Sequence, residues 1–391
     1  MSTAARRILL LAPSMRLAGG CERVVHNLSV LLAASGHCLA VASFDDAVAE
    51  WHFKSEGERF ALGRNTRLPL ALRWIEYWLQ ARKLARAKRR FRPDLTISNL
   101  WRADLVSLLS GGSDRKIALA HINVVGNPTN RLMIRMRGLV GAIYRRFDRV
   151  VAVSQPLAAE LAHLYRLRPG KCIAIENFTD APSARRRLPD DQIRRAVWCG
   201  RLVSEKNLAG LLEVWSKVCA SLDQVQLVVI GDGPLRSELE AKARHLGLRL
   251  GSDPADPTVQ VAFVGTVQSP ADYQVSGRVF LLSSLAEGLP MVLLEALALG
   301  VPVIAADCPS GGVRSALCTD GAEATGLGAL LPIPCPGDKA SQAPWLPCLV
   351  TAMTDDVQLA GWRKAALARS ERFSAARAAT HWYAAIEEVL R

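Results

Sequence analysis

Residues 284–305 of the chain read SLAEGLPMVLLEALALGVPVIA. A Gly-x-Pro turn leads into an apolar helix, and Val301–Ala305 then has the composition of a buried parallel strand. This order places Glu287 on a loop above a sheet and Glu295 two turns into the helix. The first backbone N–H groups of the helix lie between the two carboxylates, and such groups bind diphosphates. The stretch therefore predicts an α/β fold with an anion site at its strand ends.

Short apolar runs of the same kind alternate with helical patterns along the whole chain. The expected strands are Ile8–Leu11, Leu39–Ser43, Leu95–Ser98, Ile117–Ala120 and Val150–Val153, then Ala196–Cys199, Gln226–Ile230, Gln260–Val264, Val279–Leu282 and Val301–Ala305. A polar stretch, Thr179–Asp191, separates the two series and is typical of a linker. We therefore predict two doubly wound domains, 1–180 and 190–373, with the active site at the carboxyl ends of the strands.

Charge is distributed unevenly between these halves. Residues 1–180 hold 28 Lys and Arg against 14 Asp and Glu, whereas residues 181–391 hold 21 against 22. The excess of basic residues indicates either an acidic partner of the first half (nucleic acid, anionic membrane or phosphorylated substrate) or a solubilising surface.

Cysteine usage and hydropathy exclude other classes. The nine cysteines are odd in number and lack CxxC spacing, which argues against a disulfide framework or a zinc site. No apolar run is long enough to span a bilayer, and the short N-terminal run reads as a first buried strand.

A basic loop and a glycine-containing loop follow two of the expected strands of the second half. Arg201 and Lys206 lie five residues apart on a strand-to-helix loop, so both can reach one anion, although an ordinary ion pair is the alternative. Asn207 is placed to cap the next helix. Gly231 and Gly233 form a tight turn that a ligand can approach closely, although such turns also occur for structural reasons.

Two features of the first half fall at the same kind of position. Gly19 and Gly20 close the loop after the first strand, just before a helix, and are a plausible approach point for phosphate or sugar. His121 directly follows the strand Ile117–Ala120, where a histidine suits hydrogen bonding or proton chemistry better than it would elsewhere.

Six motifs occur together in a fixed order. They are Gly19-Gly20, Val151-Ala152-Val153-Ser154, Gly200-Arg201 with Glu205-Lys206-Asn207, Gly231-Asp232-Gly233-Pro234, Phe263-Val264-Gly265, and Glu287 with Glu295. In these motifs the chain resembles family four of the retaining glycosyltransferases, from about residue 8 to the end. The resemblance implies the GT-B fold, two tandem Rossmann-like domains facing a cleft, with a terminal helix, 374–391, that packs back on the first domain.

The resemblance also implies roles for the motif residues in the second domain, which would bind the nucleotide-sugar donor. Glu295 would bond the ribose hydroxyls and Glu287 the transferred sugar. Arg201 and Lys206 would hold the diphosphate and stabilise the leaving nucleoside diphosphate. The remaining donor-binding positions are the backbone at Gly288, Leu289 and Pro290 and the turn with Gly231 and Gly233.

In the first domain, the resemblance places His121 beside the donor sugar and the Gly19-Gly20 loop over the diphosphate. Front-face displacement with retention is the implied mechanism. After the strand at Ala305, however, this chain has Arg314-Ser315 where the family has a glutamate, which leaves the sugar and nucleotide open. No Asp-x-Asp motif lies at a strand end, so we predict metal-independent activity without a cofactor.

Two segments of the first domain combine arginines with apolar side chains. They are Trp74–Arg90 and Arg131–Arg149, and each is compatible either with a peripheral membrane helix or with an apolar stripe packed on the sheet. We favour contact with an anionic membrane and a glycan or polyprenyl-diphosphate-linked acceptor. The predicted protein is cytoplasmic and attached peripherally to the inner face of the membrane.

Three other functions are compatible with parts of the pattern. A nucleotide-sugar epimerase of the same fold would need no acceptor and no basic first domain. A nucleic-acid-binding protein could use the basic half, but the basic segments lack the aromatic and glycine pattern of RNA modules. A non-catalytic scaffold would not need Arg201, Lys206, Glu287, Glu295 and His121 together.

Overall fold

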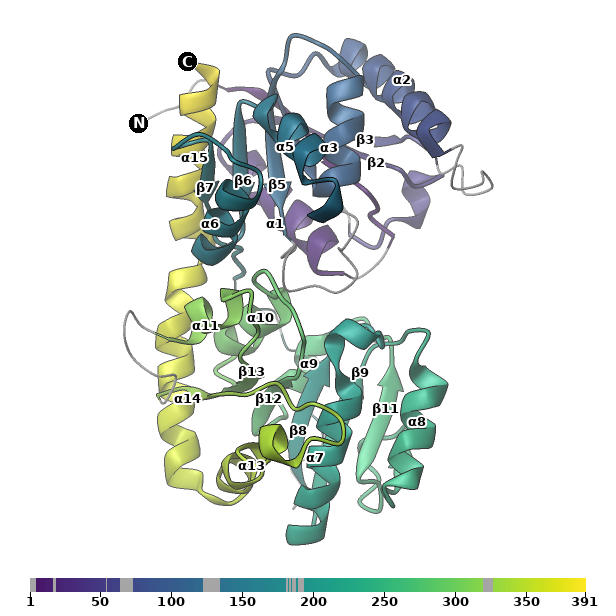
Figure 1. Ribbon diagram of the computed structural model, residues 1–391, viewed down its shortest axis with the longest axis vertical. Helices are drawn as coiled ribbons and strands as arrows, with labels where there is room; N and C mark the ends of the chain where they lie inside the picture. Colours follow the sequence, from purple (N-terminus) through teal and green to yellow (C-terminus); the bar gives the residue numbers. More distant parts are fainter. Residues whose placement is uncertain are drawn as a thin grey trace. The chain divides into compact units, whose positions relative to one another are not determined.

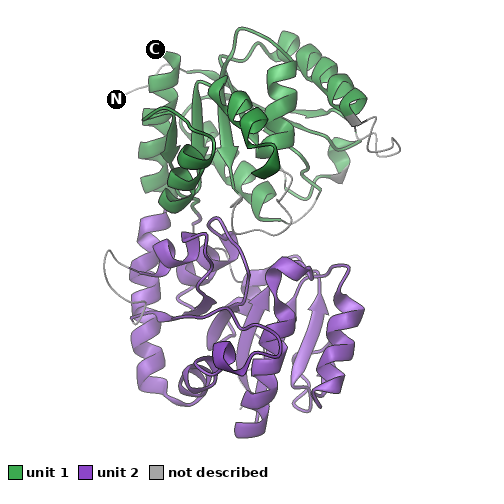
Figure 2. Ribbon diagram, viewed as in Figure 1, with its two compact units in different colours: residues 1–178, 375–391 green, residues 179–374 purple. Residues whose placement is uncertain are grey.

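The computed structural model describes residues 5–16, 19–53, 55–63, 73–121, 134–180, 182, 184, 188, 193–318 and 326–391. The chain forms two compact units (Figure 2). Unit 1 comprises Met1–Phe178 and Ala375–Arg391, and unit 2 comprises Thr179–Ser374. Most of the predicted linker, Thr179–Asp191, lies outside the described residues.

Among its described residues, unit 1 contains one sheet of seven parallel strands (Figure 1). The strands are β1 (Arg7–Ala12), β2 (Cys38–Ser43), β3 (Glu58–Ala61), β4 (Leu95–Asn99), β5 (Arg115–Ala120), β6 (Arg149–Ala152) and β7 (Cys172–Ala174). Their order is β3-β2-β1-β4-β5-β6-β7. The winding therefore reverses between β1 and β4, and open α/β sheets bind ligands outside the strand ends at such a reversal.

The described part of unit 1 also contains helices, some of which pack against this sheet. They are η1 (Val48–Glu50), α1 (Gly20–Ala34), α2 (Arg73–Phe91), α3 (Leu100–Leu109), α5 (Arg137–Arg145), α6 (Gln155–Leu164) and α15 (Ala375–Leu390). Helix α1 buries Val24, Leu28 and Leu32, which share one helical face, and the chain then turns at Gly36 with φ +81°. Of the predicted basic helix Arg131–Arg149, residues 131–133 lie outside the described part.

The C-terminal helix α15 belongs to unit 1. Its Trp382 and Ile386 are buried, and Tyr383 forms a hydrogen bond with Ser35 at the end of α1. Glu388 forms an ion pair with Arg149 at the start of β6. These contacts tie the last residues of the chain to its first half.

Unit 2 repeats the architecture of unit 1 and again shows seven parallel strands in its described part. The strands are β8 (Arg194–Cys199), β9 (Val225–Ile230), β10 (Leu250–Gly251), β11 (Val261–Gly265), β12 (Val279–Leu282), β13 (Val303–Ala306) and β14 (Gly328–Leu331). Their order is β10-β11-β9-β8-β12-β13-β14, so the winding reverses between β8 and β12. The two sheets establish the α/β fold of tandem doubly wound units that the sequence predicts.

The core of unit 2 is rich in tryptophan. The helices around it are η4 (Ser204–Lys206), α7 (Leu208–Ser221), α8 (Arg236–His245), α9 (Pro270–Gln274), α10 (Met291–Ala298), α11 (Gly312–Leu317), α12 (Lys339–Gln342), α13 (Trp345–Thr354), α14 (Asp356–Ser370) and η5 (Glu371–Phe373). Trp198, Trp215 and Trp345 are fully buried in one cluster. The indole N–H of Trp215 donates to a backbone carbonyl at 3.0 Å, and that of Trp345 does so at 2.8 Å, as buried indoles require.

Thiols and hydropathy follow the sequence-based expectations. Each of the nine cysteines lies in the described part of the chain and is a free thiol. Within the described ranges, no helix is both long enough and apolar enough to cross a bilayer.

Candidate donor-binding site

Lys206 and Glu287 form an ion pair at the reversal point of the unit 2 sheet. Lys206 ends η4, which follows β8, and Glu287 lies between β12 and α10. The Lys206 Nζ lies 2.5 Å from Glu287 Oε1, and the Ser284 hydroxyl donates to the same oxygen at 2.7 Å. Both side chains are largely enclosed, with exposed fractions of 25% for Lys206 and 11% for Glu287. The pair predicted to act on the donor is therefore already assembled within one unit.

Backbone and hydroxyl contacts join the two loops that carry this pair. The Leu285 N–H donates to the Glu205 carbonyl at 2.8 Å, and the Ser283 hydroxyl donates to the Lys206 carbonyl at 2.8 Å. The indole N–H of Trp198 donates to the Ser283 hydroxyl at 3.3 Å, which anchors the loops to the core. Lys206 and Glu287 are thus held by the fold and do not depend on each other alone for their placement.

The turn after β9 packs backbone against backbone with the turn after β8. A Cβ on Gly231, whose φ is +118°, would lie 2.0 Å from the Gly200 carbonyl oxygen. A Cβ on Gly233 would lie 2.5 Å from the Leu202 carbonyl oxygen. Close approach of two loops requires glycine at both positions. Their part in donor binding stays a prediction, since this packing alone accounts for them.

Helix α10 begins beside Glu287 and supplies backbone donors. Gly288 and Leu289 precede Pro290, the residue before the first turn. Met291 and Val292 occupy the first two helical positions, where the N–H groups have no acceptor within the helix. Glu295 lies one turn further along and is buried. The helix N-terminus therefore lies at the strand ends where Lys206 lies.

Arg201 and Asn207 flank Lys206 on the same loop. Arg201 is exposed, and its guanidinium has no ion-pair partner in the described part of unit 2. Asn207 directly precedes the first residue of α7, at the predicted cap position, but its backbone is left-handed with φ +48°. That geometry sends its side chain to the Pro334 carbonyl, to which it donates at 3.2 Å. The expectation that the Asn207 side chain caps α7 is therefore wrong.

His121 follows β5 in unit 1 and is buried beside Asn99 at the end of β4. The Asn99 amide Nδ2 donates to the Leu11 carbonyl at 3.1 Å, which fixes the amide orientation because a carbonyl can only accept. Asn99 Oδ1 therefore faces His121 Nε2, 2.9 Å away, and must accept from it. Neutral His121 thus carries its proton on Nε2, leaving Nδ1 as a hydrogen-bond acceptor.

Burial also decides the charge of this histidine. Desolvation lowers the pKa of His121 to about 4, so the ring is neutral at physiological pH. Nothing in the described part of unit 1 bonds to Nδ1. The side chain is therefore suited to accept a hydrogen bond from a hydroxyl and unsuited to store a proton near pH 7.

Gly19 lies in the loop between β1 and α1, and Gly20 is the first residue of α1; β1 is next to β4 in the sheet. Gly19 precedes α1, and its carbonyl accepts from Arg23 N–H at 3.0 Å. Residues 17 and 18 of this loop lie outside the described part. Asn99 and His121 therefore lie at the carboxyl ends of the neighbouring strands β4 and β5, and the loop with Gly19 follows β1, the neighbour of β4.

Sequence reasoning overlooked some residues of this arrangement. Ser283 and Ser284 directly follow β12, and Asn99 ends β4, so each occupies a strand end where functional side chains gather. Their position at the end of an expected strand was the sequence signal that could have identified these residues. No spacing rule links Asn99 to His121, because the two residues meet only through the pairing of β4 with β5.

Both halves of the chain match models of known families. Residues 193–369 match the model of glycosyl transferases group 1, and residues 18–181 match the model of glycosyltransferase family 4. These matches, together with the two doubly wound units, show a glycosyltransferase of the GT-B fold. The chain belongs to glycosyltransferase family four.

Relatives and solved structures agree with this assignment. The chain is 24% identical over 313 residues to the amylovoran biosynthesis glycosyltransferase AmsD of Erwinia amylovora, covering 78% of this chain and 82% of AmsD. It is 39% identical over 128 residues to TuaC of Bacillus subtilis, named for teichuronic acid biosynthesis, covering 33% of this chain but only 28% of TuaC.

A third relative is the N-acetylgalactosamine-N,N'-diacetylbacillosaminyl-diphospho-undecaprenol 4-alpha-N-acetylgalactosaminyltransferase of Campylobacter jejuni. It is 26% identical over 176 residues, covering 44% of this chain and 45% of the relative. Among solved structures, Anabaena HepE in complex with UDP-glucose has a TM-score of 0.73 at 19% identity, covering 98% of this chain and 100% of HepE. A structural likeness at that identity establishes the fold.

Proposed function

We propose that this protein is a retaining glycosyltransferase that moves a hexosyl or N-acetylhexosaminyl group from a nucleoside-diphosphate sugar to a glycan or polyprenyl-linked acceptor. The reaction would serve the synthesis of cell-surface polysaccharide or glycoconjugate. One observation carries the proposal: the Lys206 ammonium, hydrogen-bonded to Glu287, lies at the reversal point of the unit 2 sheet, where α10 begins.

The chemistry of the transfer needs positive charge at this point. The bond from the anomeric carbon to the diphosphate breaks, and the acceptor oxygen bonds to the same carbon on the same face. The acceptor proton passes to the leaving diphosphate oxygen. Lys206, Arg201 and the first N–H groups of α10 would stabilise the negative charge that develops there.

The Lys206–Glu287 pair gives a simple account of donor binding. When a donor binds, the Lys206 ammonium can donate to a diphosphate oxygen in place of the Glu287 carboxylate, because both are anionic oxygens that accept charge-assisted hydrogen bonds. Glu287, still held by the Ser284 hydroxyl, can then accept from a hydroxyl of the transferred sugar. Glu295 would bond the ribose. Gly288 to Pro290 and the Gly231–Gly233 turn would complete the donor site, and Gly19 and Gly20 would cover the diphosphate.

His121 would act on the sugar through hydrogen bonding. Its low pKa excludes it as a proton store at neutral pH, whereas Nδ1 can accept from a sugar hydroxyl. Cations and backbone donors supply the stabilisation that a metal would otherwise provide, so we propose metal-independent transfer without a cofactor. UDP is the favoured nucleotide, because the similar HepE fold is solved with UDP-glucose, and GDP is the second candidate.

An acceptor at the membrane surface is supported by one relative and by the surface of unit 1. The Campylobacter jejuni relative is named for a diphospho-undecaprenol substrate. On α2 of this chain, the exposed fractions are 65% for Trp74 and 47% for Trp78, and Met136 and Leu139 are exposed near α5. Exposed tryptophans beside arginines suit a membrane interface. We propose that the enzyme works in the cytoplasm, attached peripherally to the inner face of the membrane, without nucleic acid as a partner.

Donor binding tests the proposal directly. UDP-, GDP-, ADP- and TDP-sugars are titrated into the protein by calorimetry, and thermal shifts are recorded in parallel. We expect one nucleotide class to bind the wild type and to lose at least tenfold in affinity with Lys206→Ala. No binding of any sugar nucleotide, or unchanged binding by Lys206→Ala, contradicts the proposed function.

Lys242→Ala is the matched control. Lys242 forms an ion pair with Glu213 at 2.6 Å, with exposed fractions of 30% and 16%, close to those of the Lys206 pair. Lys242 lies on α8 and its partner on α7, away from the strand ends. A loss that is specific to the donor site therefore appears with Lys206→Ala and not with Lys242→Ala.

A further inference from the structure

Helix α2 presents two chemically different flanks to solvent. The tryptophans Trp74 and Trp78 lie on one flank, where Arg82 stacks on the Trp78 ring at 4.6 Å. Lys83, Arg86 and Arg90 recur at helical spacing on the other flank. That basic flank faces β3, the edge strand of the unit 1 sheet.

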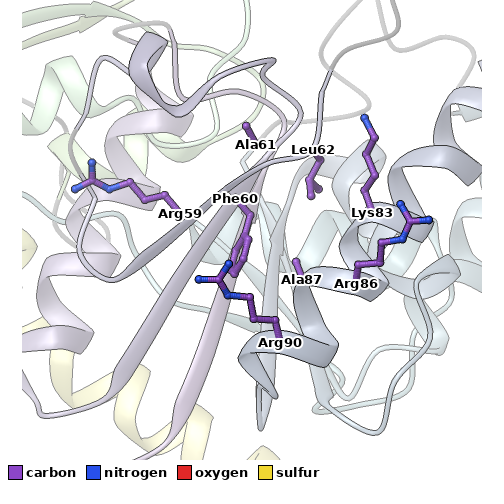
Figure 3. Close-up of a pocket in the computed structure, with 8 residues that line it drawn as sticks. All are labelled: Arg59, Phe60, Ala61, Leu62, Lys83, Arg86, Ala87 and Arg90. Carbon is purple, nitrogen blue, oxygen red and sulfur yellow. The ribbon is translucent and has the colours of Figure 1, made fainter.

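A pocket of about 420 Å³ lies between this flank and β3 (Figure 3). Phe60 and Leu62 contribute apolar surface to it, and Arg59, Lys83, Arg86 and Arg90 are its basic lining residues; the Arg90 guanidinium lies beside Phe60, whereas the Arg59 side chain extends away from it. The Leu62 N–H donates to the Ser43 carbonyl in β2. Because alternate residues of a parallel edge strand bond to the neighbour, the Ala61 N–H points to the open edge.

Local contacts involve two of the pocket's three arginines. The Arg90 guanidinium lies 5.8 Å from the centre of the Phe60 ring and 3.5 Å from Glu58. The Arg59 Nε donates to the Ser55 carbonyl at 3.2 Å. Arg86 has no ion-pair partner among the described residues.

The pocket carries more positive charge than its surroundings balance. Four basic residues and no acidic residue line the described part of the pocket, and an ion pair with Arg90 places Glu58 at its rim. An anion entering the pocket would relieve the repulsion among the cations.

We propose that this pocket binds a phosphoryl group. Guanidinium forks match phosphate oxygens bidentately, and an open pocket of this size accommodates a diphosphate. The phosphoryl group comes from an anionic lipid headgroup or from the diphosphate of a lipid-linked acceptor; the second source rests on the proposed function. The site belongs to unit 1 and is distinct from the donor residues of unit 2.

Two double variants with equal charge test the pocket. Arg86→Gln/Arg90→Gln removes two pocket arginines, whereas Arg166→Gln/Arg168→Gln removes two exposed arginines of unit 1 that follow α6 and lie outside α2. All proteins carry Lys206→Ala, so that the donor diphosphate residues contribute little. Pyrophosphate is titrated by calorimetry, and binding to phosphatidylcholine vesicles with and without phosphatidylglycerol is measured by sedimentation.

We expect the pocket pair to lower affinity at least tenfold and the control pair to change it less than twofold. Loss of pyrophosphate binding in the pocket pair alone supports a diphosphate ligand. Loss confined to phosphatidylglycerol vesicles supports a headgroup ligand. Equal losses of affinity in both pairs overturn the proposed phosphoryl site, because diffuse positive charge would then account for binding. No loss in either pair also overturns it, because the pocket would then not contribute to binding. Nucleotide-sugar binding by the protein without Lys206→Ala tests the proposed function separately.

Discussion

A Cβ atom on Gly312 would lie 1.5 Å from the carbonyl oxygen of Gly288. Gly312 opens α11, and Gly288 directly follows Glu287 in the loop before α10. A hydrogen bond joins the same loop to the residues before α11, because the Glu287 N–H donates to the Ser310 hydroxyl at 3.3 Å. The start of α11 and the loop before α10 therefore pack backbone against backbone at Gly312 and are joined through the Ser310 hydroxyl, and the absence of a side chain on Gly312 allows Glu287 to take this position.

Gly312→Ala should therefore displace the Gly288 carbonyl and, with it, Glu287. Overpacking of this kind costs about 1–3 kcal/mol of stability. We expect a lower melting temperature and at least tenfold weaker binding of the nucleotide sugar by calorimetry.

Gly361→Ala is the control, since nothing lies within 4 Å of a Cβ there and the residue is in α14. Alanine at 361 should raise helix stability by up to about 1 kcal/mol and leave donor binding unchanged. Equal behaviour of the two variants would contradict the backbone contact.

Asn99→Asp should raise the pKa of His121. A carboxylate at 99 would accept from Nε2–H and favour the imidazolium, opposing the burial that lowers the pKa of His121 to about 4. Asn99→Ala removes the acceptor but keeps the burial, so its histidine pKa should stay low while the ring loses its fixed tautomer. Nitrogen NMR of labelled histidine, assigned with His121→Gln, reads both quantities. An Nδ1–H tautomer in the wild type would contradict the hydrogen-bond chain from Leu11 through Asn99.

The central strands of both sheets could be predicted from the sequence, and the edge strands could not. Buried strands such as β1 and β9 are continuous apolar runs, which is what a parallel strand covered on both faces requires. The strands that the patterns missed are β3, β7, β10 and β14, and these are the outer strands of the two sheets. Edge strands are short and partly exposed, so they lack the apolar run; β3, for example, reads ERFA.

The candidate site was likewise predicted only in part from the sequence. Lys206, Glu287 and His121 directly follow or closely follow apolar strands, so topology alone predicts that they gather at strand ends. The contacts that orient them depend on pairing between distant segments. Ser284 reaches Glu287 across a loop turn, and Asn99 reaches His121 only because β4 pairs with β5. Single-sequence patterns contain neither fact.

Acidification should destabilise the protein through His121. Its pKa in the folded state, about 4, lies below the ordinary value of 6.5, so the unfolded chain takes up the proton first as pH falls. The stability that neutral His121 retains above pH 6.5 is therefore lost progressively between pH 6.5 and 4, by about 2 kcal/mol at pH 5. Thermal melts of wild type and His121→Gln at pH 7.5 and pH 5 check this. The wild type should lose more on acidification, whereas His26 and His37, whose pKa values burial also lowers, titrate in both proteins and cancel. Parallel pH dependence of the two melts would contradict the buried neutral ring.

Removal of the exposed tryptophans of α2 should weaken membrane binding without impairing chemistry. Trp74→Ser/Trp78→Ser removes two indoles that suit the bilayer interface, while every arginine of the helix remains. We expect at least fivefold less protein to sediment with phosphatidylglycerol vesicles, and unchanged turnover on a soluble, short-chain acceptor.

Val357→Ser/Leu367→Ser is the control, because both residues are exposed and apolar but lie on α14 of unit 2. If both double variants bind vesicles as the wild type does, the tryptophans are not a membrane contact. If the control variant loses as much vesicle binding as the tryptophan variant, exposed apolar side chains in general govern membrane binding. The tryptophan face of unit 1 is then not a specific membrane contact.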